Sequence, residues 1–527
     1  MKDYIQSGRG IVGIELGSTR IKAVLIGPDY APAASGDFTW ENRLEDGYWT
    51  YHMDEVWNGI RSAFAALKAD VLAQYGVPLT RLAGVGVSAM MHGYLAFDAD
   101  GKLLAPFRTW RNTTTAQAAA ELTALFGFNI PQRWSIAHLH QAVLNGEEHV
   151  GRIASLNTLA GYVHWQLSGE QVLGVGDASG MFPIDSATGT YDRAMMDKYE
   201  ALAAGRGCGW KLSGLLPRVV SAGEDAGRLT EAGARLLDPT GKLQPGALMA
   251  PPEGDAGTGM TATNSVAPRT GNVSAGTSVF AMIVMEKPLS KVYEEIDMVT
   301  TPTGAPVAMV HCNNCTSDIN AWAAMLQEFS AAAGRPASMN DVYGAIFRSA
   351  MTGEPDCGGN VNVNYLSGEP VTGFEEGRPL TVRMPDPALT FANFSRALVF
   401  GAMISLRLGM DILSREDVAV DRLLGHGGFF KTPGTAQKLM AGALNIPVSV
   451  MKTAGEGGPW GMALLAAYRV QKKEGQTLEQ FLNDEVFAAT TATAIAPDPT
   501  DVQGFAAYAA RFVQALKAER AAVDAMR

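Results

Sequence analysis

Two short stretches with the same pattern, roughly half a chain apart, constrain the fold most. Residues 11–26 contain an apolar strand, the turn Gly17-Ser18-Thr19 and a second β-prone segment. Residues 272–280 repeat this order, with a strand-like lead, a Gly-Thr-Ser turn and another apolar strand. Two matching hairpins indicate two related domains that face each other across a cleft.

Each of these turns is suited to binding an oxyanion such as phosphate. Backbone N–H groups and hydroxyls in a Gly, Ser and Thr turn point at one spot, and glycine has no side chain to keep a ligand away. Many hairpins carry such turns and bind nothing, so the second copy is what favours phosphate binding. Glu15, directly before the first turn, could hold the metal ion that accompanies a nucleotide.

The length and composition set the domain count and the environment. A chain of 527 residues exceeds what one hydrophobic core organises, so we expect two domains, 1–262 and 263–527. The boundary follows the Pro and Gly cluster of residues 246–262. The net charge of −11 argues against a nucleic-acid partner. Four cysteines are too few for a disulfide framework, which favours a reducing compartment.

The sequence predicts a cytoplasmic protein without a membrane partner. Its first residues are polar and lack the apolar core of a secretory signal. The most membrane-like run, residues 397–413, is interrupted by Arg407 and Asp411 and predicts a buried or amphipathic helix.

Periodicity places the main elements between these motifs. Residues 53–76, 115–125, 396–413 and 437–444 predict helices, residues 82–88 a strand, and residues 462–470 an Ala-rich helix. Residues 174–182 form a glycine-rich loop that contains Asp177, and residues 353–378 a long loop.

Three well-known binding motifs are either absent or lack the surrounding sequence that such a site requires. The G-x-G-x-x-G of residues 8–13 precedes the first strand instead of following it, which argues against a dinucleotide site. No G-x-x-x-x-G-K-[ST] occurs, which excludes P-loop kinases. Cys312 and Cys315 have metal-ligand spacing but no second cysteine pair, which argues against structural zinc.

Asp255 is the best candidate for chemistry. A kinase that transfers phosphate to an alcohol needs a carboxylate to accept the hydroxyl proton. Gly254 and the position at the domain junction favour exposure to the cleft. The alternative is a turn-forming aspartate, a common use of Asp beside Gly.

Other candidates keep two interpretations open. His92, between Met91 and Gly93 at a strand end, is either a cleft residue or a structural histidine. Trp110 either stacks on a sugar face or belongs to the core. The glycine-rich residues 425–428 and 455–461 either let an adenine ring approach the backbone or cap helices.

In this order the motifs resemble the FGGY family of carbohydrate kinases, in the actin/hexokinase-like ATPase superfamily, over nearly the whole chain. Residues 11–22 look like its first phosphate motif and residues 275–278 like its second. Residues 88–93 resemble the Met-His-Gly sugar motif of xylulokinases, and Asp255 falls where the family has its catalytic Asp. Residues 425–428 and 457–463 are similar to the adenosine motif.

The resemblance implies an α/β fold of two actin-like (ribonuclease H-like) domains, each a mixed central sheet flanked by helices, with an interdomain cleft. It implies ATP, Mg²⁺ and a sugar substrate, with Asp255 as the base and Glu15 at the metal. The implied cofactor contacts are Gly17, Ser18, Thr19, Arg20, Lys22, Gly276, Thr277, Ser278, Gly427, Gly428 and Gly458. The implied sugar contacts are Met91, His92, Trp110, Asn112 and Asp255.

Three departures from the family pattern point to a divergent subgroup. The chain has Glu15 where the family usually has Asp, and Ala89-Met90 where it has Gly-Gln. The Trp-x-Asp-x-Arg stretch is Trp110-Arg111-Asn112-Thr113-Thr114. The substrate is therefore open between a ketopentose such as xylulose and another ketose or polyol, such as ribulose, and a non-catalytic ATP- and sugar-binding role is a third reading. A homodimer is among the expected assemblies.

Overall fold

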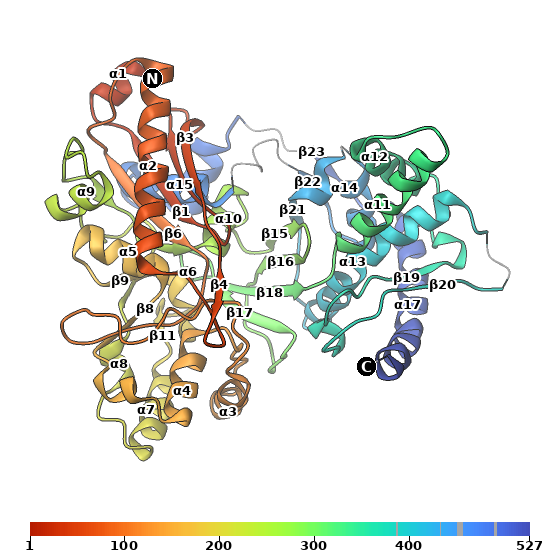
Figure 1. Ribbon diagram of the computed structural model, residues 1–527, viewed down its shortest axis with the longest axis horizontal. Helices are drawn as coiled ribbons and strands as arrows, with labels where there is room; N and C mark the ends of the chain where they lie inside the picture. The colour runs from red at the N-terminus through yellow and green to blue at the C-terminus, as the bar shows by residue number, and fades with distance from the viewer. Residues whose placement is uncertain (386–387, 433, 451–456, 490–492, 527) are drawn as a thin grey trace.

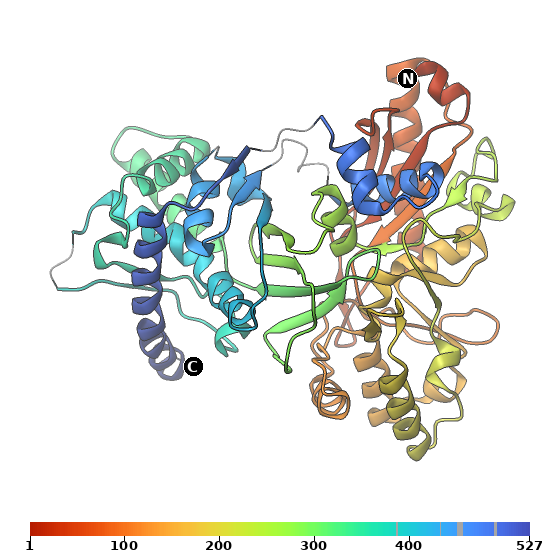
Figure 2. The ribbon, with the colours of Figure 1, turned by 180° about the vertical axis from the view of Figure 1, so that it is seen from behind.

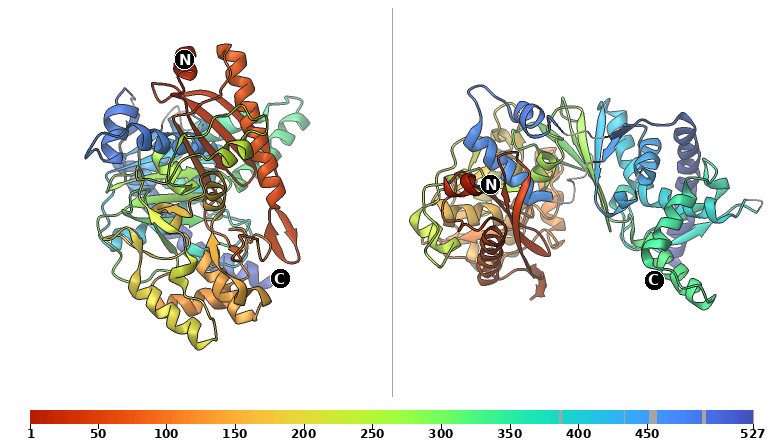
Figure 3. Two further views of the ribbon diagram at one scale, coloured as in Figure 1. Left: turned by 90° about the vertical axis from the view of Figure 1, so that its left-hand side faces the viewer. Right: turned by 90° about the horizontal axis from the view of Figure 1, so that it is seen from above.

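The computed structural model describes residues 1–385, 388–432, 434–450, 457–489 and 493–526, and it has a mixed α/β fold. Two lobes lie side by side, each with its own large sheet and its own helices (Figure 1). The views in Figure 3 show the lobes meeting along one side, with the C-terminal helix in the second lobe.

The sheet of the first lobe is built around the first predicted hairpin. Its strand order is β13-β6-β1-β2-β3, and β14 also pairs with β6. The hairpin strands β1 (Ile11–Leu16) and β2 (Arg20–Ile26) are antiparallel, whereas β6 (Gly84–Ala89) runs parallel to β1. The other strands are β3 (Pro32–Thr39), β13 (Leu248–Met249) and β14 (Glu253–Gly254).

Helices cover both faces of this sheet. The helix α2 (Met53–Tyr75) packs on β2 and β3, and α15 (Gly457–Gln471) packs on β1 and β6. The contacts are close, because a Cβ on Gly13 would lie 2.1 Å from the Pro459 carbonyl oxygen. A Cβ on Gly36 would lie 2.3 Å from the Ala63 carbonyl oxygen of α2.

Helix α15 comes from the C-terminal part of the chain but lies against the first sheet, as the blue helix beside the red strands in Figure 2 shows. The apolar residues of its middle join a core cluster with residues of the first lobe, such as Ile11 and Met91. The boundary that we placed at residue 262 divides the chain by sequence. In space, however, α15 belongs to the first lobe although it follows that boundary.

The sheet of the second lobe repeats the local arrangement of the first. Its order is β17-β18-β16-β15-β21-β22-β23. The hairpin strands β15 (Thr270–Ala275) and β16 (Val279–Val284) are antiparallel, and β21 (Arg422–His426) runs parallel to β15. The others are β17 (Ile296–Thr300), β18 (Pro306–Cys312), β22 (Val448–Val450) and β23 (Thr493–Ile495). Both hairpins thus occupy the same place in a mixed sheet, which confirms the predicted fold class.

The most apolar helix of the sequence is a core helix. In the described ranges, α13 (Phe391–Arg415) is the one helix long and apolar enough to cross a membrane, and its most apolar window is 78% buried inside the protein. It packs against α12 (Met339–Ala350), α14 (Thr435–Leu444) and α11 (Ser317–Ala332). The buried helix that we expected there is confirmed.

Most other predicted helices are present with slightly shifted ends, and two predicted loops contain regular structure. The region 174–182 contains a helical turn, α6 (Val175–Ala178). The region 353–378 contains β19 (Val361–Val363), which pairs with β20 (Leu380–Val382). Val361 and Val363 are buried in the second lobe's core, and this long-range burial overrides the loop-forming tendency of the surrounding Gly and Asn.

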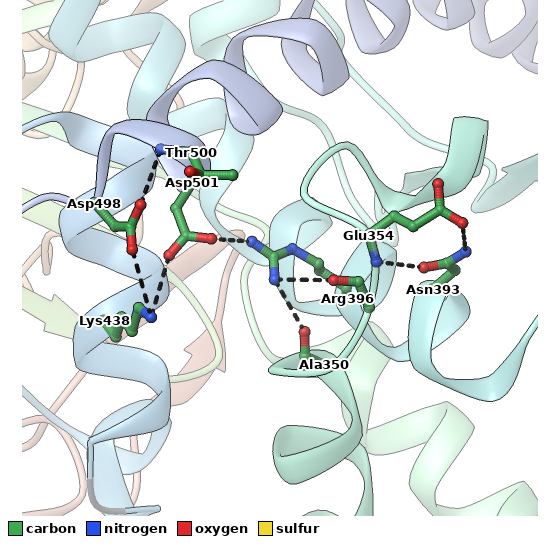
Figure 4. Close-up of polar contacts among 9 residues, drawn as sticks. Ala350, Glu354, Asn393, Arg396, Lys438, Asp498, Thr500 and Asp501 are labelled. Atoms are coloured by element: carbon green, nitrogen blue, oxygen red, sulfur yellow. Dashed lines mark hydrogen bonds and ion pairs between the residues drawn. The ribbon is translucent and has the colours of Figure 1, made fainter.

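A buried ionic network ties the C-terminal helix α17 (Pro499–Ala525) to the second lobe (Figure 4). Arg396 of α13 is 3% exposed and pairs with Asp501 of α17. The Arg396 guanidinium also donates to the Ala350 carbonyl oxygen at 3.3 Å. Lys438 Nζ of α14 lies 3.8 Å from carboxylate oxygens of both Asp498 and Asp501.

We expect Asp501→Ala to destabilise the second lobe by about 3–5 kcal/mol, because it leaves the Arg396 charge buried without its carboxylate. The matched control is Asp498→Ala, which removes an exposed helix cap on the Thr500 N–H and should cost about 1 kcal/mol. Denaturant unfolding of the purified variants measures both, and equal losses would contradict a buried ion pair at Arg396.

Candidate active site

Three aromatic donors hold the first predicted phosphate turn, residues 17–19. Trp40 Nε1 donates to the Gly17 carbonyl oxygen at 2.7 Å, and the Tyr51 hydroxyl donates to the Ser18 carbonyl oxygen at 2.6 Å. Trp110 Nε1 donates to Ser18 Oγ at 3.2 Å. The rings of Trp40 and Tyr51 stack at 4.1 Å, so the turn rests on a rigid aromatic support.

The N-terminal end of α11 holds the second turn, residues 276–278. The Gly276 N–H donates to the Ser278 carbonyl oxygen at 2.9 Å and closes the turn. Thr316 donates to the Gly276 carbonyl oxygen through both its N–H and its Oγ1, and the Cys315 N–H donates to that of Thr277. Thr277 is exposed, and the space beside the Gly276 Cα is open.

Glu15 lies opposite Lys22 in the first hairpin and against the start of α15. A Cβ on Gly458 would lie 2.1 Å from Glu15 Oε1, so the glycine leaves the space that this carboxylate fills. Burial first, and then the negative charge of Asp255, raise the pKa of Glu15 to about 7, while Lys22 lowers it. Gly458, which we predicted as a cofactor contact, is thus placed beside Glu15; Gly455 and Glu456 of the same predicted turn lie outside the described residues.

Gly427 and Gly428 follow β21 and lie beside the second turn. Gly427 has a φ of 100°, and a Cβ there would lie 2.4 Å from the Ala275 carbonyl oxygen, so this close approach requires glycine. Gly428 is exposed, with open space beside its Cα. The two glycines and the second turn therefore share one end of the second sheet.

Asp255 is the first residue of α10 (Asp255–Ala262), directly after β14. Its Oδ1 accepts a hydrogen bond from the Met91 N–H at 3.3 Å. The side chain is exposed, yet the dense protein around it raises its pKa to about 6, against the lowering effect of backbone N–H groups and Arg133. A carboxylate with this pKa is ionised and basic at neutral pH, which suits proton abstraction.

His92 is a buried, neutral imidazole in a strained backbone position, with a φ of 70°. Its Nδ1 lies 3.2 Å from the Gly180 carbonyl oxygen, and its ring is nearly parallel to that of Trp134 at 6.1 Å. Burial first, and then the charge of Arg133, hold its pKa well below the usual range. When Nδ1 donates to Gly180, Nε2 is left as a hydrogen-bond acceptor.

The remaining predicted sugar contacts divide into two groups. Trp110 is 38% exposed and reaches the first turn, whereas the Met91 side chain is buried and packs where a Cβ on Gly254 would stand. Asn112 does not join the site, because it is buried and its amide bonds to the backbone of Trp49 and Thr109. That residue holds the strand β5 (Tyr48–Thr50) in place.

Arg20, a predicted cofactor contact, is exposed and pairs with Asp37 of β3 at 3.5 Å. Lys22 lies in β2, shortly after the first turn, and is the cross-strand neighbour of Glu15. Lys22 therefore lies beside Glu15, whereas Arg20 turns toward Asp37.

Three residues that we did not predict lie close to Asp255. Arg133 pairs with Asp297 of the second lobe, and its charge acts on Asp255 and His92. Asp177 and Glu253 are buried carboxyl groups next to the start of α10. The sequence offered two signals, the acid two residues before Asp255 and Asp177 in the glycine-rich residues 174–182, but nothing local separated either acid from surface acids.

The carboxylates present fit a magnesium ion held mainly by a nucleotide. In the described ranges no group of three or more His, Cys, Asp or Glu side chains could hold a metal ion by itself. Mg²⁺ usually takes one or two carboxylates together with substrate phosphates and water. Glu15, next to Asp255 and the first turn, can supply such a ligand.

The comparison with protein families agrees with this geometry. Residues 10–239 match the N-terminal domain of the FGGY family of carbohydrate kinases, and residues 271–470 match its C-terminal domain. The chain belongs to the FGGY family of carbohydrate kinases. A comparison with curated protein sequences gave no match.

Solved structures share the fold at low sequence identity. A xyloylose kinase from Brucella ovis is 20% identical, with a TM-score of 0.77 over 98% of this chain and 100% of that chain. A xylulose kinase from Lactobacillus acidophilus is 16% identical, with a TM-score of 0.79 over 97% and 98%. A glycerol kinase from Plasmodium falciparum, solved with ADP, is 14% identical, with a TM-score of 0.75 over 96% and 98%.

We expect Gly458→Ala to destabilise the protein by about 1–3 kcal/mol, since the new methyl group overlaps the Glu15 carboxylate. Alanine is otherwise favoured over glycine by about 1 kcal/mol inside a helix. Gly428→Ala, at a position with open space, is the control and should be neutral. Glu15→Ala should restore the stability of Gly458→Ala in denaturant unfolding; a loss that persists would place its cause elsewhere.

Proposed function

We propose that the protein transfers the γ-phosphate of ATP to a hydroxyl group of a ketopentose such as xylulose. The observation that carries this proposal is the place of Asp255, at the start of α10, within reach of the Met91 N–H and of the charge of Glu15. This position suits a base that lies between the predicted sugar motif, residues 88–93, and Glu15 beside the first turn.

In the proposed reaction Asp255 accepts the proton of the attacking hydroxyl group. The N–H groups and hydroxyls of Ser18, Thr19, Thr277 and Ser278 hold the phosphates, and Lys22 adds positive charge near the first turn. ATP would supply the phosphoryl group, and Glu15 would hold a Mg²⁺ ion that neutralises part of the phosphate charge. Since phosphoryl transfer needs little covalent help, positioning and electrostatic stabilisation supply most of the rate.

On the sugar side, His92 Nε2 would accept a hydrogen bond from a substrate hydroxyl, and the exposed face of Trp110 would pack on the sugar ring. The family's Trp-x-Asp-x-Arg stretch has an aspartate where this chain has Asn112. Because the Asn112 amide bonds to the backbone, Asn112 does not replace that aspartate as a sugar contact. The charge of Arg133 lowers the pKa of Asp255, and its guanidinium would offer a donor to a polar substrate group.

Two alternatives follow from the same site. A kinase for another ketose or polyol, such as ribulose, fits the departures at Glu15 and at residues 110–114. A non-catalytic ATP- and sugar-binding member of the family would keep the turns but leave Asp255 without a role. The basic, accessible carboxylate of Asp255 favours catalysis.

We also infer a cytoplasmic location and a small-molecule sugar partner. The four cysteines are free, and burial raises the pKa of the Cys312 and Cys315 thiols, as expected for inert thiols in a reducing compartment. A homodimer stays a prediction.

A coupled ADP-release assay across ketoses, aldoses and polyols, with mass analysis of the product, tests this function. We expect one or a few ketoses to stimulate ADP release and to gain one phosphate. Nucleotide and sugar binding without any phosphorylated product would favour the non-catalytic alternative.

Asp255→Ala should lower kcat by about 10²–10⁴-fold, because it removes the base, and should leave ATP binding nearly unchanged. Single-turnover phosphorylation and nucleotide titration separate the two effects. Asp185→Ala, which removes an aspartate with local turn contacts in the same lobe, serves as the comparison and should keep full turnover. Full turnover by Asp255→Ala would remove Asp255 from the mechanism.

The pH dependence follows from the raised pKa of Asp255, about 6. Protonation below that pH removes the base, so kcat/KM should fall about tenfold for each pH unit on the acid side. The fall should begin near pH 6, well above the ordinary pKa of an aspartate, 3.8. A profile that stays flat down to pH 4.5 would contradict this assignment.

A further inference from the structure

Two buried carboxyl groups lie directly behind the proposed base. Glu253 belongs to β14, two residues before Asp255, and Asp177 belongs to α6, which packs on β14. Each residue is only 1% exposed. The proposed reaction uses neither of them, so their burial needs a separate explanation.

Two glycines, Gly174 and Gly176, leave the space that the Glu253 carboxyl group fills. A Cβ on Gly174 would lie 2.3 Å from Glu253 Oε1, and one on Gly176 would lie 2.4 Å from Oε2. The Gly176 N–H donates to Oε1 at 3.3 Å, and the Gly174 N–H donates to the Pro252 carbonyl oxygen at 2.8 Å. Residues 174–176, at the start of α6, therefore wrap around a carboxyl group.

Asp177 lies beside Gly254, the residue between Glu253 and Asp255. Its Oδ2 accepts a hydrogen bond from Thr158 Oγ1 at 2.6 Å, and its Oδ1 lies 3.4 Å from the Cβ position of Gly254. Asp177 Oδ1 and Glu253 Oε2 are both buried without a hydrogen-bond partner among the described residues. Leaving a buried acceptor unpaired costs about 1–3 kcal/mol. One proton between the two acids would remove this cost for both oxygens.

Among the described residues, no cation balances these acids. After burial, the groups that act on Asp177 are the Thr158 hydroxyl, which lowers its pKa, and the charge of Asp255, which raises it. The charge of Asp177 in turn raises the pKa of Glu253 and of the buried Tyr191 hydroxyl. On the other elements packed against α6, Arg218 of β12 (Arg218–Val220) is exposed and Asp297 of β17 pairs with Arg133. Burial raises the pKa of Asp177 to about 7, and that of Glu253 to about 8 with a further rise from Asp177. Asp255 therefore ionises first.

We propose that Asp177 and Glu253 are positioning residues that share a proton beneath the start of α10 and hold Asp255 in place for proton abstraction. This inference rests on the proposed phosphotransfer. The α6 segment extends the effect to the sugar side, because the Gly180 carbonyl oxygen just after it bonds to His92. It also contacts the second lobe, where Thr300 Oγ1 donates to the Val175 carbonyl oxygen at 3.0 Å.

The test compares Asp177→Asn with Asp177→Ala. The asparagine amide can donate and accept as a protonated acid does, so it should keep most of the activity. Alanine should lower kcat by about 100-fold through misplacement of the base, with ATP affinity unchanged. Asp185→Asn, an aspartate with local turn contacts in the same lobe, is the control and should change nothing. If the asparagine variant is as damaged as the alanine variant, the shared proton is wrong.

The pH profile of Asp177→Asn/Glu253→Gln provides a second readout. The wild type should lose kcat/KM above about pH 7–8, as the pair ionises and repels Asp255. The double variant carries no ionisable pair, so this alkaline fall should disappear. An unchanged alkaline limb would overturn the inference.

Unfolding measurements separate this inference from the proposed function. An acid with a raised pKa binds more protons in the folded state, so wild-type stability should fall as the pH rises from about 5 to 9. The double variant should lose less stability over that range. If no sugar is phosphorylated but this difference is found, the proposed function fails and the proton-sharing pair stands. If a sugar is phosphorylated but this difference is absent, the pair is rejected and the proposed function stands.

Discussion

The close packing of α15 on β1 is the contact on which the site depends most. Gly13 lets the start of the helix reach the strand, and Gly458 leaves room for the Glu15 carboxylate at the end of the same strand. A side chain at either position would push the helix away from the sheet. The position of Glu15, and with it the negative charge facing Asp255, follows from this one helix–sheet contact.

Asp255 has the lowest pKa of the four carboxyl groups gathered at this site, so it is the first of them to ionise. Burial raises the pKa of Glu15, Asp177 and Glu253 above that of Asp255, whose backbone N–H partners at Met91 and Ala256 favour ionisation. Groups with similar chemistry are separated in function by their surroundings, as in many sites that carry out acid–base chemistry near neutral pH.

Local patterns in the sequence were sufficient to predict the two hairpins, the long core helix and the family. A Gly-Ser-Thr turn between apolar strands fixes its own geometry, so residues 17–19 and 276–278 were found without tertiary information. Asn112 shows the limit of this reasoning, because its position after Trp110 suggested a sugar contact while its amide bonds to β5. Asp177, Glu253 and Arg133 gain their importance only from contacts with segments far away in the sequence.

The return of α15 to the first sheet has a consequence for synthesis on the ribosome. Until residues 457–471 have been made, the face of the first sheet that carries Ile11, Val24 and Ile26 lacks the helix that covers it. Long-range contacts of this kind delay stable folding and expose sticky surface in the meantime. Nascent chains of this protein therefore need protection from aggregation until translation is nearly complete.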